Sequence, residues 1–407
     1  MIRFTMILVL LACLLMGFAF REEKGMIVID RDTSTVIGGN NRFALDLYAK
    51  IRTRPGNVAV SPASLSHALA MTYEGARGET AREMAEVCRF PEDREAMRRG
   101  FRALNARMNG DGSSRPYRLA AVNALWAQAR DGFLPTYLAT LADDYGASMH
   151  EVDFRGAPEP SRRAINAWVD DRTNHLVPDL LSPELIGPET ALVLVNAVHY
   201  KADWATPFPA MATSPADFHA GPGRTVPVPM MRRTDDCRYA ERDGVQVLEL
   251  PYKGGDHAML VVLPRAADGL PAVEASLSTE ALGGWLAGLS TARVAVELPR
   301  FKVSDGVELA GTLAGMGMPR AFEGSADFSG MDGSRGLAIS AVAHRAVVAV
   351  DEEGTEAAAA TGVVMSRGKG LVPPATSFRA DRPFLYLIRD VKTGAVLFLG
   401  RVVDPSR

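Results

Sequence analysis

The sequence predicts an α+β fold, and three observations lead to that class. Helical periodicity dominates the N-terminal half of the 407 residues, strand-like runs dominate the C-terminal half, and the two do not alternate as βαβ units. No linker rich in Pro, Gly or Ser divides the chain, and no internal repeat occurs. We therefore expect one large domain.

Four helices are expected in the N-terminal half. Asn41–Thr53 carries apolar residues at helical spacing with charged residues between them. Ser61 followed by Pro62 is typical of an N-cap and a first helical position, and this second helix should end near Gly75. The same periodicity predicts helices over residues 79–87 and 164–176.

Strands follow in the C-terminal half. Residues 191–198 form a nearly continuous apolar run, which predicts a strand covered on both faces. A Gly-Gly turn at 254–255 separates two further strands. The expected strands span residues 191–198, 245–252, 258–263, 294–298, 343–350, 384–388 and 396–403.

The composition excludes several classes of protein. Hydrophobic residues make up 47% of the chain, charged residues 23%, and the formal net charge is −3, which is typical of a globular protein and not of a disordered or polytopic membrane chain. Without a basic surplus, nucleic acid is not an expected partner. Cys13, Cys88 and Cys237 are too few for a disulfide framework, and neither CxxC nor HExxH occurs. We expect no metal and no cofactor.

The first twenty residues have the layout of a secretory signal peptide. Met1–Phe20 contains Arg3, an apolar stretch and a small-residue cleavage site at 17–19. A periplasmic or extracellular protein is therefore expected. Three alternatives stay open: an uncleaved membrane anchor, a lipoprotein site at Cys13, and a cytoplasmic protein that begins at Met26. Membrane contact is expected only through such an anchor.

One long connection stands out near the C-terminus. The segment from Asp351 to Thr376 is longer than ordinary loops, and such segments are usually functional or disordered. Extended as a strand, it would have one charge-free face, made of Thr355, Ala357, Ala359, Thr361, Val363 and Met365. That face could enter a sheet without desolvating an ion, but Ala and Gly do not hold a strand by themselves. An Ala-rich helix or a plain flexible loop is the alternative.

Motifs spread along the chain make it recognisable. The main ones are Asn57 to Pro62, Gly75 to Thr80, Asn123 to Trp126, Ile165 to Val169, Leu194 to Asn196, Leu250 to Tyr252, Leu298 to Phe301, Ala326 to Ser329, Val342 to Thr355 and Arg382 to Phe384. Their order resembles the serpin family over roughly residues 40–405. The resemblance implies a serpin fold of three β-sheets and eight or nine helices, with an exposed reactive-centre loop at about 352–377. It also suggests an inhibitory, bacterial-type or other exported member.

The resemblance implies a function as well: an irreversible suicide-substrate inhibitor of serine proteases, and not an enzyme. The protease attacks the loop and is trapped in a covalent complex when the cleaved loop inserts into the main sheet. The native chain, expected to be a monomer, must then be kinetically trapped. An inhibitory member is favoured by the small residues of the loop hinge, which comprises Glu352, Gly354, Thr355, Glu356, Ala357, Ala358, Ala359 and Ala360. The alternative is a non-inhibitory serpin that acts as a chaperone or carrier.

Three further roles are implied by the resemblance. A buried hydrogen-bond cluster beneath the opening sheet, the shutter, is expected from Ser61, Ser64, Asn196 and His344. No GxSxG surrounds either serine, so a Ser-His hydrolase is not expected. Trp204 resembles the breach tryptophan, which lies where insertion begins. Glu352 resembles a hinge glutamate that pairs with a basic residue, and a solvated charge is its alternative.

The bond that the protease cuts falls near Gly368 when the family pattern is counted from Gly354. The reactive-bond region is therefore expected to be Met365, Arg367, Gly368 and Lys369. A cut after a basic residue suits a trypsin-like protease, which we favour, whereas Met365 would suit a chymotrypsin- or elastase-like one. A heparin-like activator would need a basic surface, and one candidate row is Arg94, Arg98, Arg99 and Arg102. Such a row is more typical of a solvated helix face.

Overall fold

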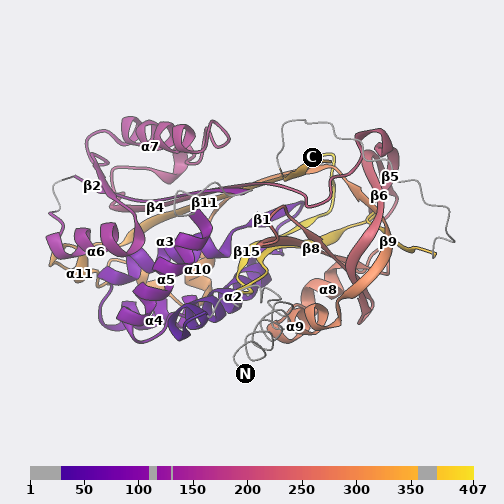
Figure 1. Cartoon of the computed structure of the whole chain (residues 1–407). Helices are drawn as coiled ribbons and strands as arrows, with labels where there is room; N and C mark the ends of the chain where they lie inside the picture. Colours follow the sequence, from indigo (N-terminus) through magenta and orange to yellow (C-terminus); the bar gives the residue numbers. More distant parts are fainter. Residues whose placement is uncertain (1–28, 110–116, 130–131, 356–373) are drawn as a thin grey trace, which may run out of the picture. The chain divides into compact units, whose positions relative to one another are not determined.

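Two β-sheets and ten α-helices make up the residues that this computed structural model describes, which are 29–109, 117–129, 132–355 and 374–407 (Figure 1). The helices belong to one unit, Arg31–Arg407. They are α2 (Arg31–Ile51), α3 (Pro62–Gly75), α4 (Gly78–Cys88), α5 (Arg94–Asn109), α6 (Pro135–Tyr145), α7 (Pro158–Arg172), α8 (Leu270–Ser276), α9 (Thr279–Gly288), α10 (Ala310–Met316) and α11 (Ser329–Asp332).

A six-stranded sheet carries the start of the loop. In spatial order its strands are β10 (Phe301–Glu308), β11 (Ile339–Val350), β12 (Gly354–Thr355), β4 (Leu192–Asp203), β2 (Tyr117–Gln128) and β3 (Met149–Val152). β4 and β11 run parallel and are joined directly by eight register pairs. Beyond these pairs β12 enters between the two strands, antiparallel to both.

The second sheet has nine strands and divides into two parts. They are β1 (Val58–Val60), β5 (Ser214–Gly221), β6 (Arg224–Arg242), β7 (Val245–Pro251), β8 (His257–Pro264), β9 (Ser290–Pro299), β13 (Thr376–Arg379), β14 (Phe384–Asp390) and β15 (Val396–Val402). The 19-residue β6 serves both parts, because one end pairs with β5 and the other with β7. Counting the two parts separately gives the three sheets that the resemblance implies.

Helices cover both faces of the six-stranded sheet. Figure 1 shows α7 on one side of β2, β4 and β11, and α3 on the other. Ile165 and Val169 of α7 lie in one core with Val193 of β4, whereas Leu69 of α3 and Leu194 of β4 belong to the other. β4 is therefore buried on both faces, as its apolar run predicts.

Some helix predictions need correction. α2 begins at Arg31, well before Asn41, because it includes Gly38 and Gly39, whose low helix propensity hides this part. A side chain on Gly39 would clash with the Arg89 carbonyl group, so packing against the end of α4 favours glycine there. The described residues hold ten α-helices against the eight or nine expected, and three of them, α8, α10 and α11, have only four to seven residues.

Two further expectations concern the leader at the N-terminus and the cysteines. Residues 1–20, the expected leader, lie outside the described residues, and so does Cys13. Among the described helices, none is long and apolar enough to cross a membrane. Export therefore stays a prediction. Cys88 and Cys237 are buried free thiols.

Candidate functional site

The hinge of the expected loop is seated in the six-stranded sheet. On β4, Gly354 pairs with Asp203 and Thr355 pairs with Ala202, while Thr355 also pairs with β11. The Thr355 side chain is completely buried. The first residue of the charge-free face therefore already lies inside the sheet.

A tight turn brings the chain from β11 into β12. The Asp351 carboxylate accepts hydrogen bonds from the backbone N–H groups of Glu353 and Gly354, at 3.0 and 3.1 Å. Such bonds from side chain to backbone are what makes Asp common in turns. At Gly354 any Cβ would clash with the Ala202 carbonyl oxygen of β4, so the close approach of the two strands requires glycine.

Two aromatic side chains hold this turn. Trp204 stacks on Tyr252 with ring centroids 4.6 Å apart, and its indole N–H donates to the Asp351 carbonyl oxygen at 3.0 Å. The Tyr252 hydroxyl lies 2.7 Å from the Thr355 hydroxyl, and burial raises the pKa of Tyr252, so that it stays protonated. Trp204 thus contacts the point where the chain enters the sheet, and its role at the breach remains a prediction.

Glu352 is paired and not solvated. The Arg300 guanidinium donates to both carboxylate oxygens at 2.6 Å, and the Thr213 hydroxyl donates to one of them at 2.5 Å. Burial alone would raise the pKa of Glu352, but the bonds from Arg300 and Thr213 outweigh burial and lower it. Of the two alternatives for Glu352, the structure shows the ion pair, which ties the hinge to the connection between β9 and β10.

Replacing Arg300 with alanine should loosen the hinge. The change leaves the Glu352 carboxylate, only 7% exposed, without its cation, at an expected cost of about 1–3 kcal/mol. Urea titration followed by tryptophan fluorescence should show an earlier transition. Arg232→Ala is the matched control, since Arg232 pairs with Glu297 at 3.1 Å and not with the hinge. An identical transition in wild type and Arg300→Ala would contradict the anchoring role.

The four expected shutter residues come together in one buried cluster. Asn196 and His344 are register partners on β4 and β11, and the ring Nδ1–H of His344 donates to the Asn196 amide oxygen. The other ring nitrogen accepts from the backbone N–H of Ser61 at 3.2 Å. The Asn196 amide donates to the Ser64 hydroxyl at 2.6 Å. All four side chains are completely buried, so their bonds hold β4, β11 and α3 together.

Asn123 completes this cluster and was not among the predicted site residues. It lies on β2 as the register partner of Asn196. Its amide oxygen accepts from the Asn196 amide and from the Ser64 hydroxyl, the latter at 3.2 Å. Asn123 begins one of the motifs that carry the resemblance, but only the strand pairing puts it next to Asn196. A polar row of Asn123, Asn196 and His344 therefore crosses three neighbouring strands.

The cluster is not arranged for hydrolysis. The Ser61 hydroxyl donates to the Leu397 carbonyl oxygen of β15 at 2.8 Å and so does not cap α3. The Ser64 hydroxyl bonds the two asparagines, and neither hydroxyl bonds His344. Burial lowers the pKa of His344 to about 3, so the ring is neutral at pH 7. Both ring nitrogens already form hydrogen bonds, to Ser61 and Asn196. These contacts fit a structural latch better than a nucleophile and its base.

His344→Ala should speed the conversion of the native protein into polymers or into a self-inserted form. The change leaves the Ser61 N–H and the Asn196 oxygen unpaired in a buried site, at an expected cost of about 1–3 kcal/mol to the pairing of β4 with β11. Native gels after graded heating measure the conversion. His67→Ala is the matched control, because His67 is also buried but lies on α3 and bonds the Tyr145 carbonyl oxygen. Equal conversion in both variants would refute a specific latch.

The remaining predicted site residues cannot be placed. Glu356 and Ala357–Ala360 of the hinge lie outside the described residues. The same holds for the reactive-bond region, which consists of Met365, Arg367, Gly368 and Lys369. The position of the scissile bond therefore stays a prediction.

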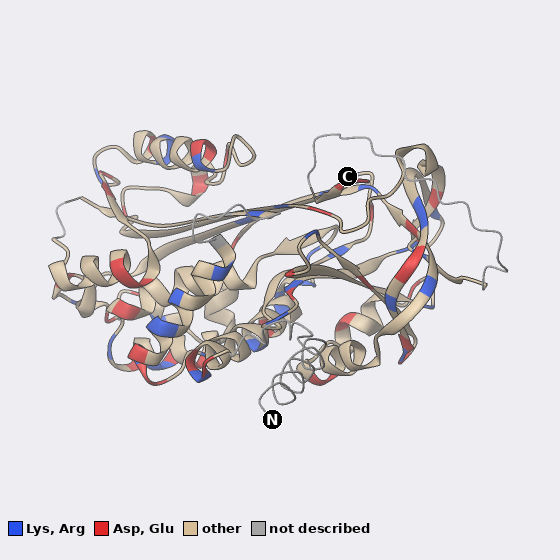
Figure 2. Ribbon diagram, in the orientation of Figure 1, with Lys and Arg blue, Asp and Glu red and all other residues tan. Residues whose placement is uncertain are grey.

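The basic row on α5 is neutralised by acids on neighbouring elements (Figure 2). Arg98 pairs with Glu74 at 2.8 Å and Arg99 with Asp32 at 2.7 Å. Arg102 is likewise paired with an aspartate, and Arg94 donates to backbone carbonyl groups. The row is thus an internally paired surface, which does not favour a polyanionic activator.

Comparisons with known proteins identify the family of the chain. The sequence matches the family described as "Serpin (serine protease inhibitor)" over residues 38–405. A serpin-like protein of Thermococcus kodakarensis is 41% identical over 372 residues, 91% of this chain and 86% of that protein. Leukocyte elastase inhibitor of Bos taurus is 40% identical over 376 residues, 90% of this chain and 98% of that protein. The crystal structure of human thyroxine-binding globulin with thyroxine is 31% identical, with a TM-score of 0.84 over 92% of this chain and 99% of that one.

These relatives do not bear out the expectation of a bacterial-type, exported member. They agree with the fold, and the family match covers residues 38–405. The chain belongs to the serpin family.

Proposed function

We propose that the protein inhibits serine proteases as a suicide substrate, by inserting its cleaved loop as a new strand between β4 and β11. The observation that carries this proposal is the seat of Gly354 and Thr355 at the point where insertion would begin: both pair with β4, and Thr355 also pairs with β11. Family membership and the similarity to leukocyte elastase inhibitor support it.

Insertion would continue an arrangement that β12 has begun. β4 and β11 must separate along their eight parallel pairs, and the incoming strand would run antiparallel to β4 as β12 does. Every second side chain would then enter the core, and the sequence has no charge on that face as far as Met365. About a dozen inserted residues span roughly 40 Å, which sets how far an attached protease would be displaced.

Trypsin should form an SDS-stable covalent adduct with the protein and release a C-terminal fragment. Since Arg367 and Lys369 lie in the expected reactive-bond region, the mass of this fragment should place the cut after one of them. Elastase is the comparison protease, because the bovine relative is named an elastase inhibitor. A cut after Met365, or an adduct with elastase alone, would overturn the trypsin-like target. If no serine protease gives an adduct, the inhibitory function fails.

A non-inhibitory carrier is the second candidate, and the similarity to thyroxine-binding globulin in complex with thyroxine favours it. In that case the proteases would cleave the loop as an ordinary substrate and leave no adduct. Denaturing gels of the same incubation therefore separate the two functions.

A further inference from the structure

A cavity of about 750 Å³ opens where the end of α2 meets the turn between β5 and β6 and the start of α8. None of the described hinge or shutter residues lines it. Its walls are mainly apolar and include Ala220, Pro222, Leu270, Pro271, Pro383 and Val403. Sites for small molecules typically have this size and an apolar lining with a few polar groups.

One cation in this cavity, which we call the Arg52 cavity, has no partner among the residues that the structure describes. Arg52 directly follows the last residue of α2, and its side chain has no hydrogen bond or ion pair with any residue that the structure describes. The Arg52 side chain is half-buried, so its guanidinium is only partly solvated. An anionic ligand in the cavity would supply the hydrogen-bond acceptor that no described residue provides.

The other charges of the Arg52 cavity are paired or solvated. Arg401 donates to Glu274 at 2.9 Å and to the Arg52 carbonyl oxygen at 2.7 Å, and so fixes the turn that presents Arg52. Arg54 forms a bidentate ion pair with a carboxylate outside the cavity. Asp268 is exposed, so water solvates it and it needs no ligand. Arg52 is therefore the group that would orient a ligand.

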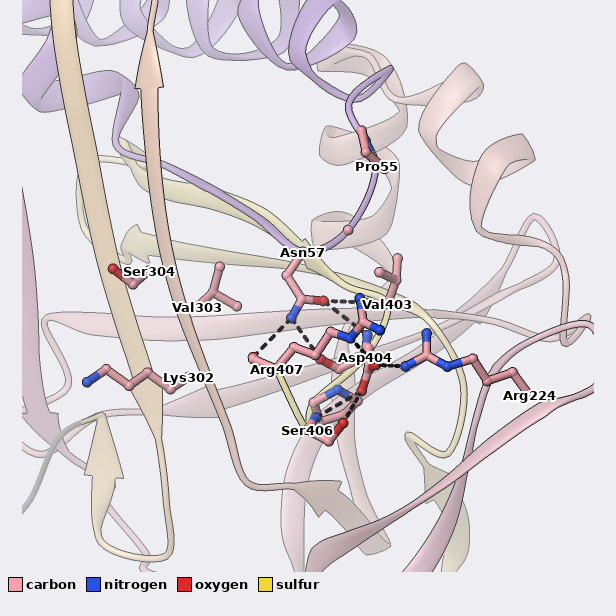
Figure 3. A pocket seen from close by; sticks show the side chains of 12 residues that line it. Pro55, Asn57, Arg224, Lys302, Val303, Ser304, Val403, Asp404, Ser406 and Arg407 are labelled. Carbon is pink, nitrogen blue, oxygen red and sulfur yellow. Dashed lines mark hydrogen bonds and ion pairs between the residues drawn. The ribbon is translucent and has the colours of Figure 1, made fainter. Parts of the chain in front are cut away.

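A second cavity, of about 700 Å³, shares Val403 with the Arg52 cavity but differs in its charges (Figure 3). Arg224 and Arg407 are both paired there with Asp404. Lys302 points away from that group in Figure 3. Of the two cavities, only the Arg52 cavity combines mainly apolar walls with a half-buried arginine that has no partner among the described residues.

We infer that the Arg52 cavity binds an amphipathic carboxylate. The apolar chain packs against the proline- and leucine-lined wall, and the carboxylate accepts hydrogen bonds from the Arg52 guanidinium, whose planar N–H groups match carboxylate geometry. The inference does not rest on protease inhibition, because the lining of the cavity includes none of the described hinge residues, and the cavity would bind the ligand in an inhibitor or a carrier alike.

Isothermal titration calorimetry of the full chain with sodium decanoate tests this inference. We expect one binding site per chain. Arg52→Gln should weaken binding about tenfold or more, since a hydrogen bond to a charged group is lost. Ala267→Trp, on the exposed connection before α8, should fill the cavity and abolish binding. Arg224→Gln, in the second cavity, is the matched charge control and should bind as wild type does.

Decylammonium, which has the same chain and the opposite charge, should bind at least about tenfold more weakly than decanoate. The inference is overturned if decanoate does not bind, if Arg52→Gln or Ala267→Trp binds it as tightly as wild type, or if decylammonium binds equally well. Circular dichroism melting curves establish that each variant is folded. Should Arg52→Gln fail to fold, Ala267→Trp and the decylammonium comparison still decide the outcome.

Discussion

Cleavage of the loop should raise the melting temperature of the protein by about 20 °C. Insertion would replace one β4–β11 interface of eight pairs by two new interfaces, a net gain of roughly ten hydrogen bonds worth about 1 kcal/mol each. In a chain of this size 1 kcal/mol corresponds to about 2 °C. Differential scanning calorimetry before and after cleavage by trypsin measures the change.

The intact protein would then lie above its own inserted form in free energy and persist because the conversion is slow. Equal melting temperatures for intact and cleaved protein would contradict insertion. The calorimetry tests insertion of the loop and the gel assay tests formation of the adduct, so the two experiments test separate statements.

Thr355→Arg should abolish inhibition while leaving the loop cleavable. Thr355 is completely buried beside Tyr252, and a guanidinium placed there would be desolvated without a counter-charge, at an expected cost of several kcal/mol. The hinge would leave the sheet, and insertion would slow by more than about tenfold, because each 1.4 kcal/mol in a barrier is a factor of ten in rate. Trypsin would then be released by hydrolysis, and the adduct on denaturing gels should fall accordingly.

Thr376→Arg provides the matched control for this experiment. It makes the same exchange on β13, on the other side of the loop, where the strand pairs with β9 and does not enter the six-stranded sheet. This variant should form the adduct as wild type does, and its cleaved form should show the same rise in melting temperature. Undiminished adduct formation by Thr355→Arg would refute the role of the hinge seat, and loss in both variants would point to impaired recognition by the protease.

The helices and strands that could be predicted are those that a local sequence pattern, such as an apolar run or a turn motif, indicates by itself. The apolar run at 191–198 predicts β4, and the Gly-Gly turn predicts the β7–β8 hairpin, because both signals need no distant partner. β2 was missed: its sequence YRLAAVNALWAQ suits a helix as well as a strand, and eleven register pairs with β4 hold it extended. Pairing, and not propensity, decides its conformation.

The candidate site likewise has a part that could be predicted from the sequence and a part that could not. Residue types and their family roles were available from the sequence, which is why Glu352 and the four shutter residues could be named. Their hydrogen-bond partners could not be predicted from the sequence, because Arg300 is 52 residues from Glu352, and Asn123 is 73 residues from Asn196. Contacts over such separations depend on which strands lie side by side, and a single sequence does not contain that information.

The polar row across β2, β4 and β11 has a consequence for the order of events in insertion. Asn196 lies six residues along β4 from Ala202, where Thr355 is seated, a distance of about 20 Å. With the pairing of β12 continued, residue 361 would arrive opposite Asn196, and Thr361 is the hydroxyl-bearing residue that follows four alanines. Insertion would thus reach a halfway point at which the hydrogen bond between His344 and Asn196 must break. The Thr361 hydroxyl would replace that bond before the second half of the inserted strand pairs.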